Sequence, residues 1–170
     1  MRFDSNAFLH ILSSEEMHDW IMTLHSQGFL NRFERTVQTY IVAYVLMVCF
    51  YGEEALYEPR PIKIEERPNS RGEDPIPDIS LPSQNFKGVP EVWIELKDYF
   101  GQSGLTDQDL RDLRWDFTKA ADACNEGNMG IVLIVGEDRV AIMGEIEEDG
   151  LVETFSQVEV IVIGGISPYA

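Results

Sequence analysis

The sequence predicts one α/β domain with a central mixed β-sheet flanked by helices. Its 170 residues fit a single domain, 1–170, with a sizeable core. Helix-like segments come before and after a group of strand-like segments, an order that is typical of helices packed on a sheet. Between them, Met129–Val135 is an uninterrupted apolar run, which indicates a central buried strand.

The first helix is predicted within the N-terminal 30 residues. Ser13 and Glu16 have the spacing of a capping box, in which a serine and a glutamate bond the free N–H groups of a helix start. The helix then runs to Ser26 and stops at Gly28. Residues 1–30 are therefore expected to form a helical extension in front of the core.

A second helix is predicted from Asn31 onward. The segment Phe33–Phe50 is rich in β-branched residues, but its length and the lack of a turn residue before Gly52 favour a helix over a strand. Its apolar part, Tyr40–Phe50, is shorter than the ~18 residues of a membrane span. We therefore expect a buried helix and no membrane association.

Three strands and another helix are expected next. Tyr57–Glu66 indicates an edge strand or a bulge because prolines interrupt it. Ile76–Leu81 is a short strand, and Glu91–Tyr99 is a stronger one. Asp107–Glu126 then places its apolar residues at intervals of three and four, which predicts an amphipathic helix that begins near Thr106.

The C-terminal residues, 137–170, are predicted to add strands to the sheet. Arg139–Ile146 and Val158–Ile163 both read as strands. Asp149-Gly150 lies between them and is a typical turn sequence. We therefore expect extra C-terminal strands beyond the helix and strand that complete the core.

The charge balance is strongly acidic. Thirty Asp and Glu residues face thirteen Lys and Arg, which gives a formal net charge of −17 and a pI near 4.4. Such a field repels nucleic acid and anionic membranes unless bases cluster locally or a divalent cation intervenes. The two cysteines, Cys49 and Cys124, lie among apolar residues and are expected to be buried thiols. No signal peptide is recognisable, so a cytoplasmic protein is expected.

Two neighbouring predicted strands carry two acids and a lysine. Side chains alternate between the faces of a strand, so Glu95 and Lys97 project together, about 6–7 Å apart at the backbone. If the preceding strand pairs beside this one, Asp78 joins them. Two hard oxygen ligands and an amine are the minimum equipment for holding Mg²⁺ next to a phosphodiester.

With Pro77-Asp78 and Glu95-Leu96-Lys97 in this order, the chain resembles the PD-(D/E)xK superfamily, whose members share the restriction-endonuclease-like fold. The resemblance covers residues 31–136, roughly three-fifths of the chain, with a long helix before the motif and a helix and a strand after it. It implies a Mg²⁺- or Mn²⁺-dependent nuclease that acts on DNA or RNA.

The resemblance also implies roles for individual residues. Asp78 and Glu95 correspond to the metal ligands, with the Leu96 carbonyl as a further oxygen ligand. Lys97 corresponds to the residue near the attacking water. Glu34 matches the glutamate that many members carry on the first helix.

Each of these residues also has a structural explanation. Asp78 follows two prolines and suits a turn. Glu95 and Lys97 suit an exposed ion pair, which contributes less than about 1 kcal/mol. Glu34 lies three residues after Asn31, a capping distance, and a glutamate in a first helical turn is favoured by the helix dipole regardless of function.

Other charged residues also have two explanations. Glu53 and Glu54 are alternative candidates for the carboxylate of the preceding helix if its register differs. On the helix 107–126, three bases are in reach of a phosphate, but three acids alternate with them, which predicts a solvated face; the bases are Arg111, Arg114 and Lys119, and the acids are Asp109, Asp112 and Asp116.

Two functions remain as expectations. The first is a Mg²⁺-dependent nuclease that hydrolyses phosphodiester bonds. The second is a non-catalytic acidic interaction protein on the same scaffold, such as an immunity protein or an inhibitor that covers the basic surface of a nuclease or toxin. The sequence leaves a homodimer open.

Overall fold

The computed structural model describes residues 5–30, 34–51, 63–64, 77–81, 92–102 and 104–166. Its helices are α1 (Ser5–Leu12), α2 (Glu15–Ser26), α3 (Glu34–Tyr51), α4 (Asp107–Asn125), α5 (Arg139–Glu148) and α6 (Leu151–Thr154). Its strands are β1 (Lys63–Ile64), β2 (Ile79–Leu81), β3 (Val92–Asp98), β4 (Met129–Asp138) and β5 (Glu159–Gly165).

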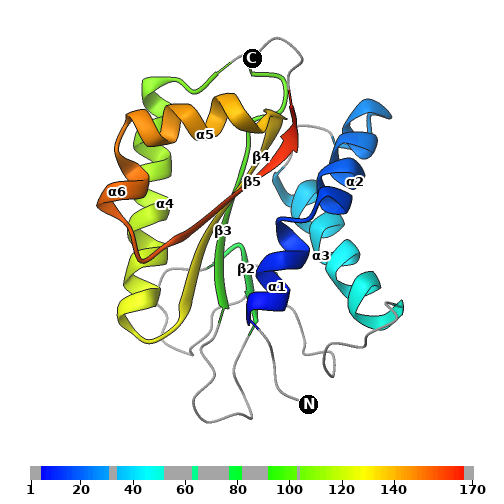
Figure 1. Ribbon diagram of the computed structural model, residues 1–170, viewed down its shortest axis with the longest axis horizontal. Coiled ribbons are helices and arrows are strands. Elements are labelled where there is room, and N and C mark those ends of the chain that lie inside the picture. The colour runs from blue at the N-terminus through cyan, green and yellow to red at the C-terminus, as the bar shows by residue number, and fades with distance from the viewer. Residues whose placement is uncertain are drawn as a thin grey trace.

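The strands form one mixed sheet in the order β1-β2-β3-β4-β5. The pairs β1–β2 and β2–β3 are antiparallel, whereas β3–β4 and β4–β5 are parallel. Parallel neighbours need a crossover connection, and α4 supplies one while α5 and α6 supply the other. Figure 1 shows α1, α2 and α3 on one side of the sheet and α4, α5 and α6 on the other. The predicted mixed sheet flanked by helices is therefore confirmed.

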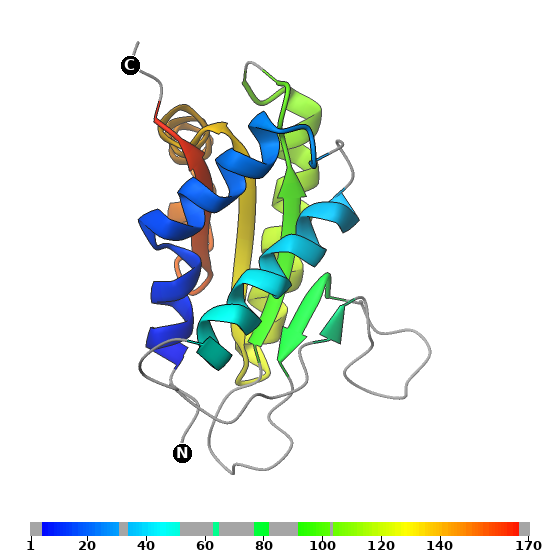
Figure 2. The same ribbon diagram turned by 90° about the vertical axis from the view of Figure 1, so that its right-hand side faces the viewer.

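The sheet separates two apolar cores. On one face, α1, α2 and α3 lie across the strands (Figure 2) and bury residues such as Ile94, Leu96 and Leu133. On the other face, α4 and α5 cover Val132 and its neighbours. Because β4 has a core on each face, alternate residues enter different cores and all must be apolar. The prediction of a buried central strand at Met129–Val135 is confirmed.

Residues 139–148 are a helix, so the predicted strand Arg139–Ile146 is wrong. The side chain of Asp138 caps this helix by accepting hydrogen bonds from the N–H groups of Val140 and Ala141, at 3.0 and 3.1 Å. Ile142 and Ile146, one helical turn apart, then enter the second core.

The Asp149-Gly150 pair does not join two strands either. It joins α5 to α6, and Gly150 has a φ of 74°, which glycine adopts without steric cost. Within the described residues after β4, only β5 is a strand, so the expected C-terminal strands are reduced to one. The predicted strand at Val158–Ile163 corresponds to β5.

The N-terminal helices differ from the prediction at their ends. Ser14, and not Ser13, caps α2 by accepting a hydrogen bond from the Met17 N–H at 3.2 Å. Ser13 instead donates to the Leu9 carbonyl at the end of α1, a helix that the sequence did not predict. The long helix beginning near residue 34 is confirmed as α3.

Some predicted features lie outside the described residues. These are the Asn31 cap, the alternative candidates Glu53 and Glu54, and most of the strand Tyr57–Glu66, of which Lys63–Ile64 forms β1. Within the described ranges, no helix combines the length and the apolarity that a bilayer crossing requires.

Candidate functional site

The strand β3 presents two charged residues to the helix α4. Trp93, Glu95 and Lys97 alternate with Ile94 and Leu96, which enter the core on the opposite face. Only 1% of Glu95 is exposed to solvent, whereas Lys97 is partly exposed. Glu95 and Lys97 therefore project from one face of β3, as predicted. Glu95, however, is buried and not solvated.

Asp78 lies immediately before β2 and contacts β3. Because Ile79 pairs with Ile94 in the antiparallel ladder, Asp78 is in register with Glu95. One carboxylate oxygen of Asp78 accepts a hydrogen bond from the Leu96 N–H at 2.7 Å. The two strands thus bring Asp78 beside Glu95 and Lys97, as the sequence predicted.

Two residues of α4 complete the group. Asp116 and Lys119 are one helical turn apart, and Lys119 Nζ lies 2.9 Å from Asp116 Oδ1. Lys119 also donates a hydrogen bond to Glu95 Oε2, and Lys97 Nζ lies 3.2 Å from Asp116 Oδ2. The prediction that these helix residues form a solvated face is wrong for Asp116, of which 2% is exposed, and for the half-buried Lys119.

A sequence signal for this burial exists. Asp116 lies between Leu113 and Phe117 on the apolar stripe of α4, and Lys119 directly precedes Ala120 of the same stripe. A charge flanked by core residues on a helix faces the boundary of the core and not the open solvent.

Glu34 reaches the same group from α3. Its Oε2 lies 3.8 Å from Lys97 Nζ, and 38% of its side chain is exposed. As the first residue of α3 it also has the position that the helix dipole favours. We call the six residues Glu34, Asp78, Glu95, Lys97, Asp116 and Lys119 the acid–lysine cluster.

Burial controls the protonation of the acids in this cluster. It raises the pKa of Glu95 to about 7, although the ammonium group of Lys119 and the indole of Trp93 oppose the shift. Burial likewise raises the pKa of Glu34 to about 6 and raises the pKa of Asp78. The neighbouring carboxylates add to these upward shifts. The cluster therefore holds negative charge at a cost that a bound cation would relieve.

The two lysines stay protonated. Burial alone would lower the pKa of Lys97 and of Lys119, but the carboxylates around them outweigh it and raise both pKa values. For Lys97 the main partner is Asp116, and for Lys119 the partners are Glu95 and Asp116.

The predicted metal ligands supply the right kind of donor. Carboxylate and carbonyl oxygens are what Mg²⁺ prefers. Both oxygens of Glu95 are engaged, however, because Trp93 Nε1 donates to Oε1 at 2.6 Å and Lys119 donates to Oε2. Among the described residues, no three His, Cys, Asp or Glu side chains are grouped closely enough to hold a metal. Lys119 thus supplies the positive charge beside Glu95 in this arrangement.

No protein-family model matches the chain, and no curated protein matches it.

Proposed function

We propose that the chain is a Mg²⁺- or Mn²⁺-dependent nuclease that hydrolyses phosphodiester bonds at the acid–lysine cluster. The observation that supports this function best is the meeting of Asp78, Glu95 and Lys97 at one end of the β2–β3 ladder. Buried carboxylates with raised pKa values beside a charged lysine are typical of sites that bind a cation or move a proton. An ion pair that only stabilises the fold needs one carboxylate and one lysine. It explains neither the additional carboxylates of the cluster nor the burial of Glu95.

The donors for the ion would be Asp78, Glu95 and the carbonyl of Leu96. The N–H of Leu96 points toward Asp78, and in a strand the C=O of a residue points to the same side as its N–H. The ion would supply Lewis acidity and lower the pKa of a bound water. Lys97, held protonated by Asp116, would orient that water or stabilise the charge that develops on the phosphate.

Lys119 has to release Glu95 before an ion can bind there. Its second partner, Asp116, makes this exchange feasible, because the ammonium group keeps one ion pair at 2.9 Å after it leaves Glu95. A buried ammonium without any partner would be far more costly. The pair Asp116–Lys119 is thus able to retain its charge balance while Glu95 changes partner.

The test is a titration with Mg²⁺ and Mn²⁺ by calorimetry, combined with cleavage assays on single- and double-stranded DNA and RNA. Wild type, Asp78→Asn and Glu95→Gln are compared with Glu148→Gln, an exposed acid on α5. We expect both cluster variants to lose metal binding and cleavage, and the control to keep them. Metal binding that survives Glu95→Gln in a folded protein contradicts the proposal.

Both carboxylate oxygens of Glu95 already accept hydrogen bonds, and this observation favours a second candidate function. If Trp93 and Lys119 hold this carboxylate permanently, the cluster is a structural network, and the chain is a non-catalytic acidic protein that covers a basic nuclease or toxin. A charge of −17 would steer it toward such a partner. This candidate predicts no metal binding and a complex that weakens with salt. Replacing Lys97 by methionine abolishes cleavage under the first proposal but leaves the complex intact under the second.

A further inference from the structure

One glycine in α5 is not required by the backbone conformation or by the packing of the fold. With one exception, the described glycines either have a positive φ or have other atoms within about 3 Å of the position that a Cβ would take. The first group is Gly28, Gly101, Gly127 and Gly150, and the second is Gly104, Gly130, Gly136, Gly164 and Gly165. The exception is Gly144, which lies inside a helix, where glycine is unfavourable. A Cβ added there meets nothing within 4 Å.

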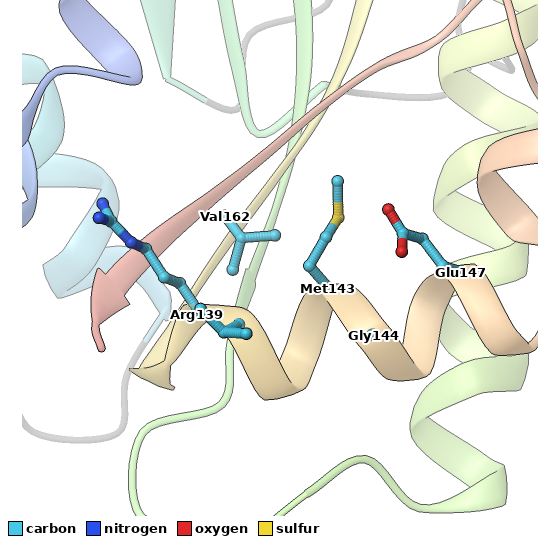
Figure 3. Close-up of a pocket in the computed structure, with 6 residues that line it drawn as sticks. Arg139, Met143, Gly144, Glu147 and Val162 are labelled. Atoms are coloured by element: carbon cyan, nitrogen blue, oxygen red, sulfur yellow. The ribbon is translucent and has the colours of Figure 1, made fainter. Parts of the chain in front are cut away.

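The open space at Gly144 belongs to a groove between α5 and β5. The groove has a volume of about 470 Å³. Val140, Met143 and Val162 give it an apolar lining, and Arg139 and Glu147 lie at its two ends (Figure 3). Half of Val140 is exposed. We call this surface the α5–β5 groove.

The groove lies beside the open edge of the sheet. β5 is the last strand in the described sheet order. The N–H of Gly164 points away from β4, because it donates to His18 Nδ1 at 3.2 Å. Successive N–H groups of a strand point in alternating directions, so those of Val162 and Val160 also point outward. An extended segment would find backbone partners along this edge.

The charges around the groove favour a basic occupant. Arg139 is already paired with Glu15 at 2.9 Å, which leaves Glu147 as the charged group lining the groove without a salt bridge among the described residues. Glu148 and Glu159 are exposed on the two elements that border it. The net charge of −17 makes a second copy of this chain an unfavourable occupant, since the two copies would repel each other.

We propose that the α5–β5 groove binds an extended segment of a partner protein that carries, on one face, apolar residues followed by a Lys or Arg. The segment adds to the edge of β5 through its backbone and places its apolar side chains against Met143 and Val162. A Lys or Arg at the end of the same face reaches Glu147, because side chains two residues apart in a strand share a face. Gly144 allows the backbone of the segment to approach α5 closely. This interaction does not depend on whether the acid–lysine cluster binds a metal.

The probe is a set of fluorescent strand peptides, about nine residues long, with Val or Ile at every second position, Lys or Arg at the last position of that same face, and Thr at the positions between. A matched set carries Glu in place of the basic residues. Binding is measured by anisotropy without divalent ions or nucleic acid, so its failure does not bear on the nuclease proposal. Gly144→Trp fills the groove, and Ala141→Trp adds the same ring to an exposed position of α5 outside it.

We expect the basic peptides to bind wild type and the acidic peptides not to bind. Gly144→Trp should weaken binding at least about tenfold, a loss of about 1.4 kcal/mol, and Ala141→Trp should leave it within about twofold. Glu147→Lys should weaken binding more than Glu148→Lys, and this pair carries the test if Gly144→Trp does not fold.

Three results would overturn the proposal. The first is that none of the basic peptides binds. The second is that the tryptophan and lysine variants affect binding no more than their controls do. The third is a concentration-dependent dimer, detected by sedimentation, that Gly144→Trp dissociates, because a second copy then occupies the groove.

Discussion

Glu95→Gln should remove a pH dependence from the stability of the protein. Burial raises the pKa of Glu95 from 4.5 to about 7, so the folded state binds this proton more tightly than the unfolded state does. The stabilising contribution of the protonated carboxyl is fully present below about pH 4.5 and is lost as the pH rises through about 7. At 1.36 kcal/mol for each pKa unit, the loss is about 3 kcal/mol. Glu95 is 1% exposed, so solvent screening reduces this figure little.

The assay is urea unfolding of wild type and Glu95→Gln at about pH 5 and about pH 8. Glu34, whose pKa burial raises to about 6, titrates in both proteins and cancels in the comparison. Wild type should lose about 2.5 kcal/mol more than the variant between the two pH values, because part of the contribution is already lost at pH 5. Saturating Mg²⁺ should remove most of this difference if the ion replaces the proton on Glu95. Parallel pH profiles without Mg²⁺ would refute the reasoning about burial.

Three further variants test other parts of the structure. His18→Leu should cost about 1–3 kcal/mol at pH 8, because the Gly164 N–H loses its acceptor. Burial lowers the pKa of His18, so its contribution is present above about pH 6.5 and is lost as the pH falls; the deficit of the variant in urea unfolding should therefore narrow at pH 5. Gly144→Ala should raise the free energy of unfolding by about 0.5–1 kcal/mol, and a lower melting temperature would show that the space at this position is not open. Asp138→Ala should lower the free energy of unfolding by about 1 kcal/mol, because α5 loses its cap. Asp122→Ala, at an exposed position of α4, should have little effect; equal effects of the two variants would argue against the cap.

Local patterns predicted the elements that position the site. The alternation along β3 was sufficient to place Glu95 and Lys97 on one face, because the period of a strand is fixed by its backbone. The expected start of α4 near Thr106 is likewise confirmed, and the structure shows a capping box there, formed by Thr106 and Asp109. The register that brings Asp78 to β3 followed from the simplest pairing of neighbouring strands.

Long-range packing decided what the sequence did not show. The alternating charges along α4 predicted a solvated face, although Asp116 and Lys119 also border the apolar stripe of this helix. The packing of α4 on β3 buries Asp116 and half-buries Lys119. The composition of Arg139–Ile146 suits a strand, but the segment is a helix that Asp138 caps. In this helix Ile142 and Ile146 lie on one face and pack into the second core. Both outcomes depend on contacts between distant segments, which override local preference.

The hydrogen bond from the Leu96 amide to Asp78 makes a backbone proton into a sensor of one carboxylate. Asp78 occupies the place where a longer β2 would have offered a carbonyl, so deuterium exchange at Leu96 follows the position of this side chain. Exchange at the neighbouring strand pair Ile79–Ile94 supplies the reference, since its bonds belong to the ladder itself. A cation that draws the Asp78 carboxylate away from β3 would speed deuterium exchange at the Leu96 amide and not at the Ile79–Ile94 pair. Cation binding by Asp78 is therefore measurable before any substrate has been identified.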